Sequence, residues 1–85
     1  MKYTISYKES AYEELLQLPA NIAHKIKNAI DSLSENPRPH SCKKLKGSVN
    51  DYRIRIGNYR VVYTIIDTIL IVTVIKIAHR KDVYR

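Results

Sequence analysis

Three arginines recur at alternate positions around a Gly-Asn pair, a pattern that suits phosphate binding. Residues 52–63 alternate on both sides of this pair, as in a β-hairpin with a two-residue turn whose glycine takes a positive φ. Pairing outward from the turn sets Arg55 opposite Arg60 and puts Arg53 on the same face. Like charges directly across a hairpin cost roughly 0.2–1 kcal/mol. Because guanidinium groups fit phosphate oxygens bidentately, three on one face favour a phosphate-binding surface over a solvated one.

A lysine-rich segment leads into this hairpin. Lysines of this kind are most often solvating residues, but beside an arginine face they can extend a track for phosphate groups and bind RNA or the ribosome. The lysines concerned are Lys43, Lys44 and Lys46.

Metal and carboxylate chemistry have no support in the sequence. His24 and His40 have no partners at metal-ligand spacing, so we expect no metal and no cofactor. Asp67 and Asp82 are the only acidic residues after Asp51, which gives no pair of carboxylates for acid–base work.

Length and charge favour one small domain, residues 1–85, with an anionic partner. The net charge is +7, and residues 52–85 hold seven Lys and Arg against two Asp and Glu. Such an excess favours nucleic acid or a membrane surface. We expect no membrane association, since the chain has no basic amphipathic helix and no apolar segment of membrane-spanning length. A lone cysteine, Cys42, and an N-terminus without an apolar signal region favour the cytoplasm.

The remaining periodicities predict the elements that position the arginines. Residues 2–7 alternate as a strand, a capping box from Ser10 to Glu13 begins a helix that ends before Pro19, and residues 21–35 carry the apolar stripe of a second helix. The hairpin follows, and then a third strand. We therefore predict an α+β fold in which a two-helix hairpin packs on one face of a small, mainly antiparallel four-stranded sheet, in the order strand, helix, helix, strand, strand, strand.

For the last strand, the sequence leaves open which side chains lie on the arginine face of the sheet. Its run over 69–75 is apolar on both faces, so one face needs a cover other than the helices, such as a partner chain. A tight turn at Asp67-Thr68 places Ile75 opposite Arg60. Strict alternation then puts His79 on the arginine face and points Arg80 away, unless a bulge or the strand end near Ala78 reverses the facing.

The element order and four short motifs resemble the RelE branch of the RelE/ParE toxin superfamily across essentially the whole chain. The motifs are Lys-Leu-Lys-Gly at 44–47, Tyr-Arg-Ile-Arg at 52–55, Gly-Asn-Tyr-Arg-Val-Val-Tyr at 57–63 and His-Arg-Lys-Asp-Val-Tyr at 79–84. The resemblance implies a type II toxin with a cognate antitoxin carrying an acidic, helical segment. It further implies an enzyme that enters the ribosomal A site and cuts messenger RNA without a metal or cofactor.

Carried over by position, the resemblance assigns catalytic roles to four arginines and a tyrosine. These residues are Arg53, Arg55, Arg60, Arg80 and Tyr84. It favours Arg80 over His79 on the arginine face. Members of the family that carry lysine at positions 53 and 55 differ from this chain.

RNA cleavage by attack of a ribose 2′-OH on the adjacent phosphorus suits these residues. Arginines stabilise the charge that grows on the non-bridging oxygens. Arginine stays protonated and cannot take the 2′-OH proton, so the candidate bases are Tyr84 and, as second choice, His79.

Two alternatives remain open. One is a ParE-like inhibitor of DNA gyrase, which needs no nuclease site; the presence of Arg60, Arg80 and Tyr84 argues against it. The other is a non-enzymatic nucleic-acid-binding module that uses the same basic face.

Overall fold

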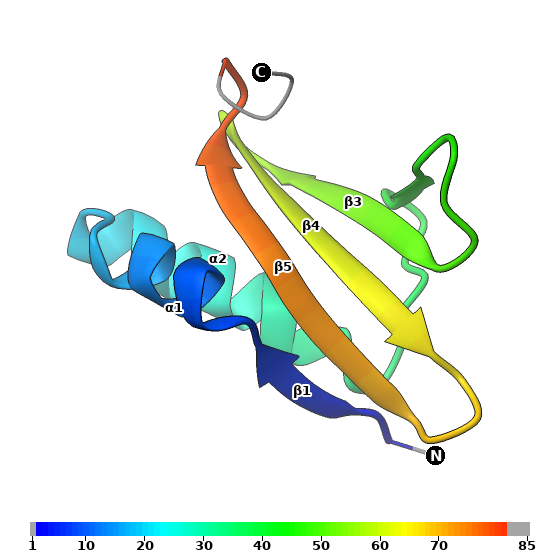
Figure 1. The fold of residues 1–85 in the computed structure, drawn as a ribbon. Helices are drawn as coiled ribbons and strands as arrows, with labels where there is room; N and C mark the ends of the chain where they lie inside the picture. The colour runs from blue at the N-terminus through cyan, green and yellow to red at the C-terminus, as the bar shows by residue number, and fades with distance from the viewer. Residues whose placement is uncertain (1, 82–85) are drawn as a thin grey trace.

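The protein folds into two helices packed on one face of a five-stranded sheet (Figure 1). The computed structural model describes residues 2–81. In chain order its elements are β1 (Thr4–Tyr7), α1 (Glu9–Leu16), α2 (Ala20–Ser32), β2 (Lys43–Lys44), β3 (Asp51–Ile56), β4 (Tyr59–Ile66) and β5 (Ile71–His79). The strand order is β1-β5-β4-β3-β2, with β1 parallel to β5 and every other pair antiparallel.

This architecture confirms the predicted α+β class and corrects the strand count. The prediction of four strands missed β2, whose two residues pair with Arg53 and Tyr52 of β3 at the edge of the sheet. A strand of two residues is too short to show alternation in a sequence.

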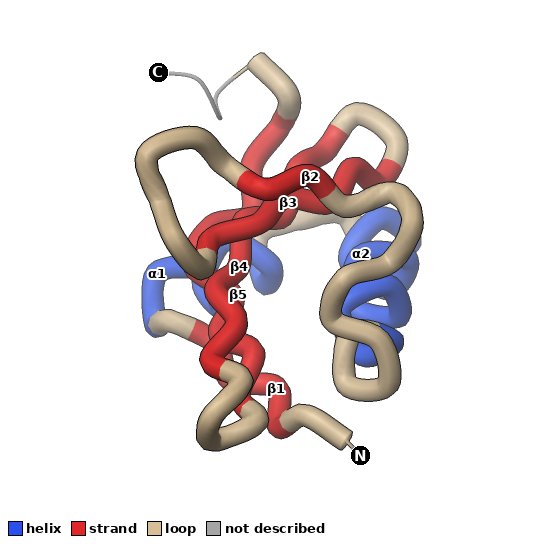
Figure 2. Tube along the Cα trace, turned by 90° about the vertical axis from the view of Figure 1, so that its right-hand side faces the viewer, coloured by secondary structure: helices blue, strands red, loops and turns tan. Residues whose placement is uncertain are grey.

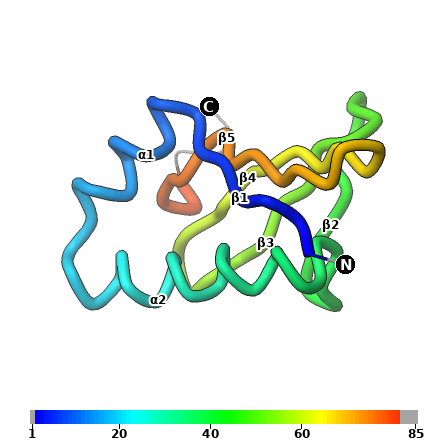
Figure 3. Tube along the Cα trace, turned by 90° about the horizontal axis from the view of Figure 1, so that it is seen from below, coloured from blue at the N-terminus to red at the C-terminus, as the bar shows by residue number. Residues whose placement is uncertain are grey.

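Each helix packs on the sheet through the apolar side chains on one of its faces. Ala11 and Leu15 of α1 and Ile26 and Ile30 of α2 are buried, and α2 runs along one side of the strands in Figures 2 and 3. The core also takes in Leu33, Ile54, Val61, Tyr63, Ile65, Val72, Val74 and Ile77. The sheet therefore buries one face under the helices and leaves the other to the arginines.

The predicted capping box at Ser10 is wrong. The N-cap of α1 is Lys8, without a side-chain cap hydrogen bond. The backbone N–H of Lys8 still donates to the carbonyl of Val74 at 2.9 Å, so the chain leaves β5 only at that residue and the helix begins immediately after it. Glu9 then lies in the first turn, where a carboxylate interacts favourably with the helix dipole.

The arginine hairpin forms in the predicted register. Arg55 pairs with Arg60, Arg53 with Val62, and the pairing continues outward to Tyr52 and Tyr63. Gly57 has a φ of 59°, the left-handed conformation that the turn needs and that glycine adopts without steric cost.

The connection from β4 to β5 differs from the prediction at two points. The turn spans four residues, 67–70, in place of Asp67-Thr68 alone, and Ile66 pairs with Ile71. A shift of two positions leaves the facing of every later side chain unchanged.

A β-bulge then reverses that facing. Tyr63 pairs with Val74 while Val62 pairs with Lys76, so Ile75 is the extra residue. Arg60 consequently lies opposite Ala78, where strict alternation had placed Ile75. The predicted reversal occurs, three residues earlier than expected, and one extra residue suffices for it.

The apolar run over 69–75 is divided between turn and strand. Ile69 lies in the turn and is 59% exposed, whereas Val72 and Val74 are fully buried against the helices. Ile71 and Ile75 are half-buried on the opposite face. Among the described residues, no helix is long and apolar enough to cross a membrane.

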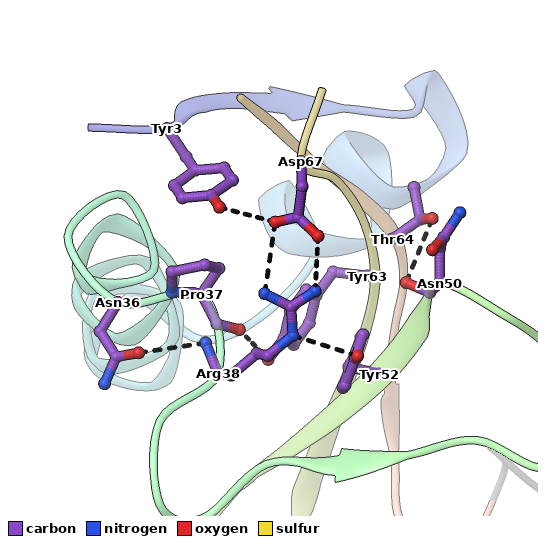
Figure 4. A network of polar contacts seen from close by, with 9 residues as sticks. All are labelled: Tyr3, Asn36, Pro37, Arg38, Asn50, Tyr52, Tyr63, Thr64 and Asp67. Carbon is purple, nitrogen blue, oxygen red and sulfur yellow. Dashed lines mark hydrogen bonds and ion pairs between the residues drawn. The ribbon is translucent and has the colours of Figure 1, made fainter. Parts of the chain in front are cut away.

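A polar clamp of Arg38, Asp67, Tyr3 and Tyr52 ties four distant segments together (Figure 4). The Arg38 guanidinium donates two hydrogen bonds to the Asp67 carboxylate, at 2.8 and 3.3 Å, and a third to the Tyr52 hydroxyl. The Tyr3 hydroxyl donates to the same carboxylate at 2.6 Å. Hydrogen bonds from Arg38 and Tyr3 lower the pKa of Asp67, and the bond to Asp67 raises the pKa of Tyr3.

We predict that Asp67→Asn lowers the midpoint of thermal unfolding by roughly 2–6 °C at neutral pH, the scale of one good surface pair in a small domain. A depressed carboxyl pKa stabilises the fold above its unfolded value of about 4, and a raised tyrosine pKa does so below about 10. The difference from wild type should therefore persist between these limits and shrink outside them, as measured by circular dichroism across pH.

Glu35→Gln is the matched control for this prediction. It breaks the Lys2–Glu35 ion pair, in which both side chains are mostly exposed, and it should move the midpoint far less. Equal effects of the two substitutions would show that the clamp contributes no more than an ordinary surface pair.

Candidate functional site

Five cations from four successive strands converge on the sheet face that the helices leave open. We call this set the cationic face. Lys43 of β2 pairs with Arg53 of β3, and Arg55 of β3 pairs with Arg60 of β4. Arg80 follows β5, two residues after the Ala78 that pairs with Arg60, and its N–H donates to the carbonyl of Asn58 at 2.7 Å.

Arg60 is the buried centre of the cationic face. Its side chain belongs to a residue that is only 7% exposed, and within residues 2–81 its Nε and Nη1 atoms have no hydrogen-bond partner. Burial lowers the pKa of Arg60, and the charges of Arg55, Arg53 and Arg80 lower it further. The fold thus holds a desolvated guanidinium among like charges, an arrangement that costs stability.

This geometry is that of an anion-binding site. Desolvated donors that are already oriented interact with a negatively charged group far more strongly than donors in water do. An arginine remains charged under these conditions, so Nε and Nη1 of Arg60 are buried donor atoms that a bound anion would satisfy. The charges of Arg55, Arg53 and Arg80 act on the same guanidinium group.

The structure describes one of the two candidate bases, His79. His79 pairs with Tyr59, one residue beyond Ala78, so alternation places it on the helix side of the sheet. Its ring meets that of Tyr59 edge to face at 5.4 Å, and its Nδ1 accepts a hydrogen bond from the N–H of Lys81. Tyr84 lies outside the described residues.

The three predicted lysines do not share one surface. Lys43 joins the cationic face, but Lys44 pairs with Tyr52 and so points to the opposite side of the short strand. Lys46 is exposed in the turn that follows. Only Lys43 is placed to contact the same phosphate track as the arginines.

Two features of the site have no counterpart in the sequence prediction. Glu14 of α1 accepts a hydrogen bond from the N–H of Ile77 at 3.0 Å and lies 3.5 Å from the Lys76 amine. It covers the edge of β5 beyond β1, and no sequence signal links residues so far apart. The second feature is a groove of about 530 Å³ beside β2, lined by Ser41, Cys42, Lys43, Arg53 and Arg55.

A metal centre is not among the features of this site. Within the part of the chain that the structure describes, no three His, Cys, Asp or Glu residues come together as metal ligands. The chemistry of the cationic face is that of guanidinium groups.

Fold and site together define a small α+β domain with a cationic sheet face, and the sequence comparison assigns its family. The family described as the ParE toxin of type II toxin–antitoxin systems, ParDE, matches residues 5–84. The chain therefore belongs to the RelE/ParE toxin family, the toxins of type II toxin–antitoxin systems.

Similar proteins and structures span nearly the whole chain. Toxin RelE3 of Methanocaldococcus jannaschii is 35% identical over 94% of this chain and 93% of its own length. The mRNA interferase toxin RelE of Escherichia coli is 30% identical over 95% of this chain and 86% of its own length. The archaeal RelE–RelB complex from Pyrococcus horikoshii matches with a TM-score of 0.84 at 25% identity, over 96% of this chain and 99% of that one.

We predict that Arg60→Met raises the midpoint of thermal unfolding by roughly 3–6 °C, because it replaces a buried, partly unpartnered cation with an apolar chain of similar length. The exposed Arg55→Met should raise it less, since it removes only repulsion. A marked fall in the midpoint for Arg60→Met, followed by circular dichroism, would contradict the inference that Arg60 is held at a cost.

Proposed function

We propose that this toxin is a metal-independent endoribonuclease that cuts messenger RNA on the ribosome and so inhibits translation. The observation that carries the proposal is Arg60, buried among other arginines with two donor atoms that have no partner among residues 2–81. A site for developing negative charge needs this arrangement, and a purely structural surface does not. The similarity to an E. coli protein named an mRNA interferase supports the same reading.

The reaction is attack of a ribose 2′-oxygen on the adjacent phosphorus. The bond from the 2′-oxygen to phosphorus forms while the bond from phosphorus to the 5′-oxygen of the next nucleotide breaks. A base takes the 2′-OH proton, and an acid supplies a proton to the departing 5′-oxygen. The products are a 2′,3′-cyclic phosphate and a 5′-hydroxyl end.

We assign the cations of this face different roles in the reaction according to how deeply each one is buried. Arg60 holds the non-bridging oxygens of the scissile phosphate, where charge grows in the transition state, because its donors are desolvated and fixed. Arg55 and Arg80 flank it and supply further donors. Lys43 and Arg53 bind the backbone beside it, and exposed lysines such as Lys46 add long-range attraction.

Tyr84 is the base that fits this proposal better than His79. Tyr84 follows Arg80 by four positions in the sequence, and the bulge in β5 places Arg80 on the same face of the sheet as Arg60. Neighbouring guanidinium groups favour a phenolate and so assist proton removal from the 2′-OH. His79 lies on the other side of the sheet, packed against Tyr59.

Dependence on the ribosome follows from the small size of the site. The described residues offer a cationic face and adjoining grooves rather than an enclosed cleft for RNA. Orientation of the reacting atoms can lower a barrier by as much as about 7–11 kcal/mol. We propose that the ribosome supplies that orientation by presenting the messenger in a fixed path.

An antitoxin is the second proposed partner. A solved relative is a RelE–RelB complex, and the charges of the cationic face call for a partner with acidic side chains. We propose that an acidic, helical antitoxin segment covers this face together with the half-buried Ile71 and Ile75.

We predict that Arg60→Ala lowers single-turnover cleavage of ribosome-bound messenger by about 10²–10³-fold, the loss typical of one oxyanion donor. Ribosome affinity should fall much less, since the exposed lysines carry the general attraction. The measurement follows cyclic-phosphate and 5′-hydroxyl ends with purified programmed ribosomes.

Lys46→Ala is the matched control. It should weaken binding and reduce the salt dependence while leaving the saturating rate unchanged. Wild-type cleavage of free RNA at the same rate would remove the role of the ribosome. Absence of cleavage with inhibition of DNA gyrase, or with RNA binding alone, would instead favour one of the two alternative functions.

We predict that Tyr84→Phe, which removes only a hydroxyl, lowers the single-turnover rate by about 10²–10⁴-fold. If the phenol of Tyr84 is the base, the wild-type rate should keep rising with pH above neutrality, because an ordinary phenol has a pKa of about 10 and an imidazole one of about 6.5. A rate that levels at about pH 6.5–7, with a fully active Tyr84→Phe variant, would assign the proton transfer to His79.

A further inference from the structure

The groove beside β2 adjoins the cationic face and is not occupied by any part of the described chain. It has a volume of about 530 Å³, within the range of sites for small ligands. Two of its lining residues, Arg53 and Arg55, also belong to the cationic face. Because Arg55 pairs with Arg60, the groove begins one strand away from the proposed position of the scissile phosphate.

The lining of the groove combines cations with small polar groups. Lys43 lies directly across from Arg53, so both charges bound the same side of the groove. Successive residues that share a face of a strand are about 6.6 Å apart, which separates the Arg53 and Arg55 charges along β3. On the loop side the exposed Ser41 borders the groove, and the half-buried Cys42 beside it packs against the hydrophobic core.

The loop that carries Ser41 and Cys42 is held in place by contacts outside the groove. The N–H of Cys42 donates to the carbonyl of Pro39 at 2.9 Å. The Tyr63 hydroxyl donates to the carbonyl of Pro37 at 2.8 Å from a fully buried ring. Figure 2 shows this loop passing from the end of α2 to β2 at the edge of the sheet. The groove is therefore a formed surface in the free protein.

We propose that this groove binds the nucleotide next to the scissile phosphate and that Ser41 reads its base. The proposal rests on the function proposed above and assigns a subsite to it. Lys43 and Arg53 hold the flanking phosphate, since cations bind the backbone without reading sequence. The Ser41 hydroxyl donates to or accepts from the exposed edge of an unstacked base, which is how single-stranded RNA is recognised.

The test compares cleavage rates rather than overall activity. Single-turnover rates are measured on ribosomes programmed with a panel of messengers that differ only in the base on either side of the cut. Ser41→Ala should change the ratios between bases by about 2- to 10-fold, the contribution of one hydrogen bond, with a smaller change in the mean rate. Lys43→Ala should lower all rates by a similar factor.

Ser10→Ala is the control, because Ser10 is exposed on α1, in the layer away from the groove. It should leave every ratio as in the wild type. Unchanged ratios in a folded Ser41→Ala variant would overturn the groove proposal while the proposed nuclease stands.

A second readout does not require cleavage. A messenger with a 2′-deoxy sugar at the cut and 4-thiouridine beside it is bound to the ribosome–toxin complex and irradiated. Crosslinks to the peptide that contains residues 41–43 support the subsite, and crosslinks confined to other peptides, or none, overturn it. If the wild-type protein cuts no messenger, the proposed function fails and the groove proposal, which rests on it, fails with it; cleavage with unchanged ratios and no crosslink to this peptide overturns the groove proposal alone.

Discussion

One extra residue in β5 determines which side chains lie on the cationic face of the sheet and which lie in the core. The pleat sends alternate side chains to opposite faces, so a strand without a bulge would have turned Arg80 toward the helices. Because Ile75 is inserted between the pairs at Val74 and Lys76, the facing changes there. The apolar residues Val72 and Val74 before the bulge pack on the helices, and Arg80 after it lies with the arginines. A single strand thereby serves both the core and the cationic face.

The core and the cationic face oppose each other energetically. Residues such as Ile26, Ile30 and Val61 are fully buried on one side of the sheet, and their transfer from water favours folding. On the other side of the sheet Arg60 is desolvated among like charges, and this arrangement disfavours folding. A domain of 85 residues buries a small fraction of its surface compared with larger proteins, so a charge held in this way is a notable cost. Such a cost is typical of residues kept for function rather than stability.

The polar clamp connects parts of the chain at the margin of the hydrophobic core, against which Tyr3 and Tyr52 pack. Arg38 and Asp67 come from the loop after α2 and the turn after β4, and Tyr3 precedes β1. Stacking of Tyr52 on Tyr63 continues the clamp into the sheet. The loop held at its start by Pro37 and Arg38 ends at β2, beside Arg53. The clamp thus positions the segment that carries Ser41 and Cys42 without contributing a residue to the cationic face.

The sequence by itself determined the hairpin register, the grouping of Arg53, Arg55 and Arg60, and the two helices. These features depend on residues close together in the chain. Side chains repeat every 2 residues in a strand and every 3.6 in a helix, so the local pattern determines the face on which each side chain lies. The tertiary structure alone decided the bulge at Ile75, the burial of Arg60, the pairing of β2 and the clamp. Each of these depends on contacts between distant residues, such as Tyr3 and Asp67, 64 positions apart. No local pattern encodes such contacts, because the packing of whole elements selects them.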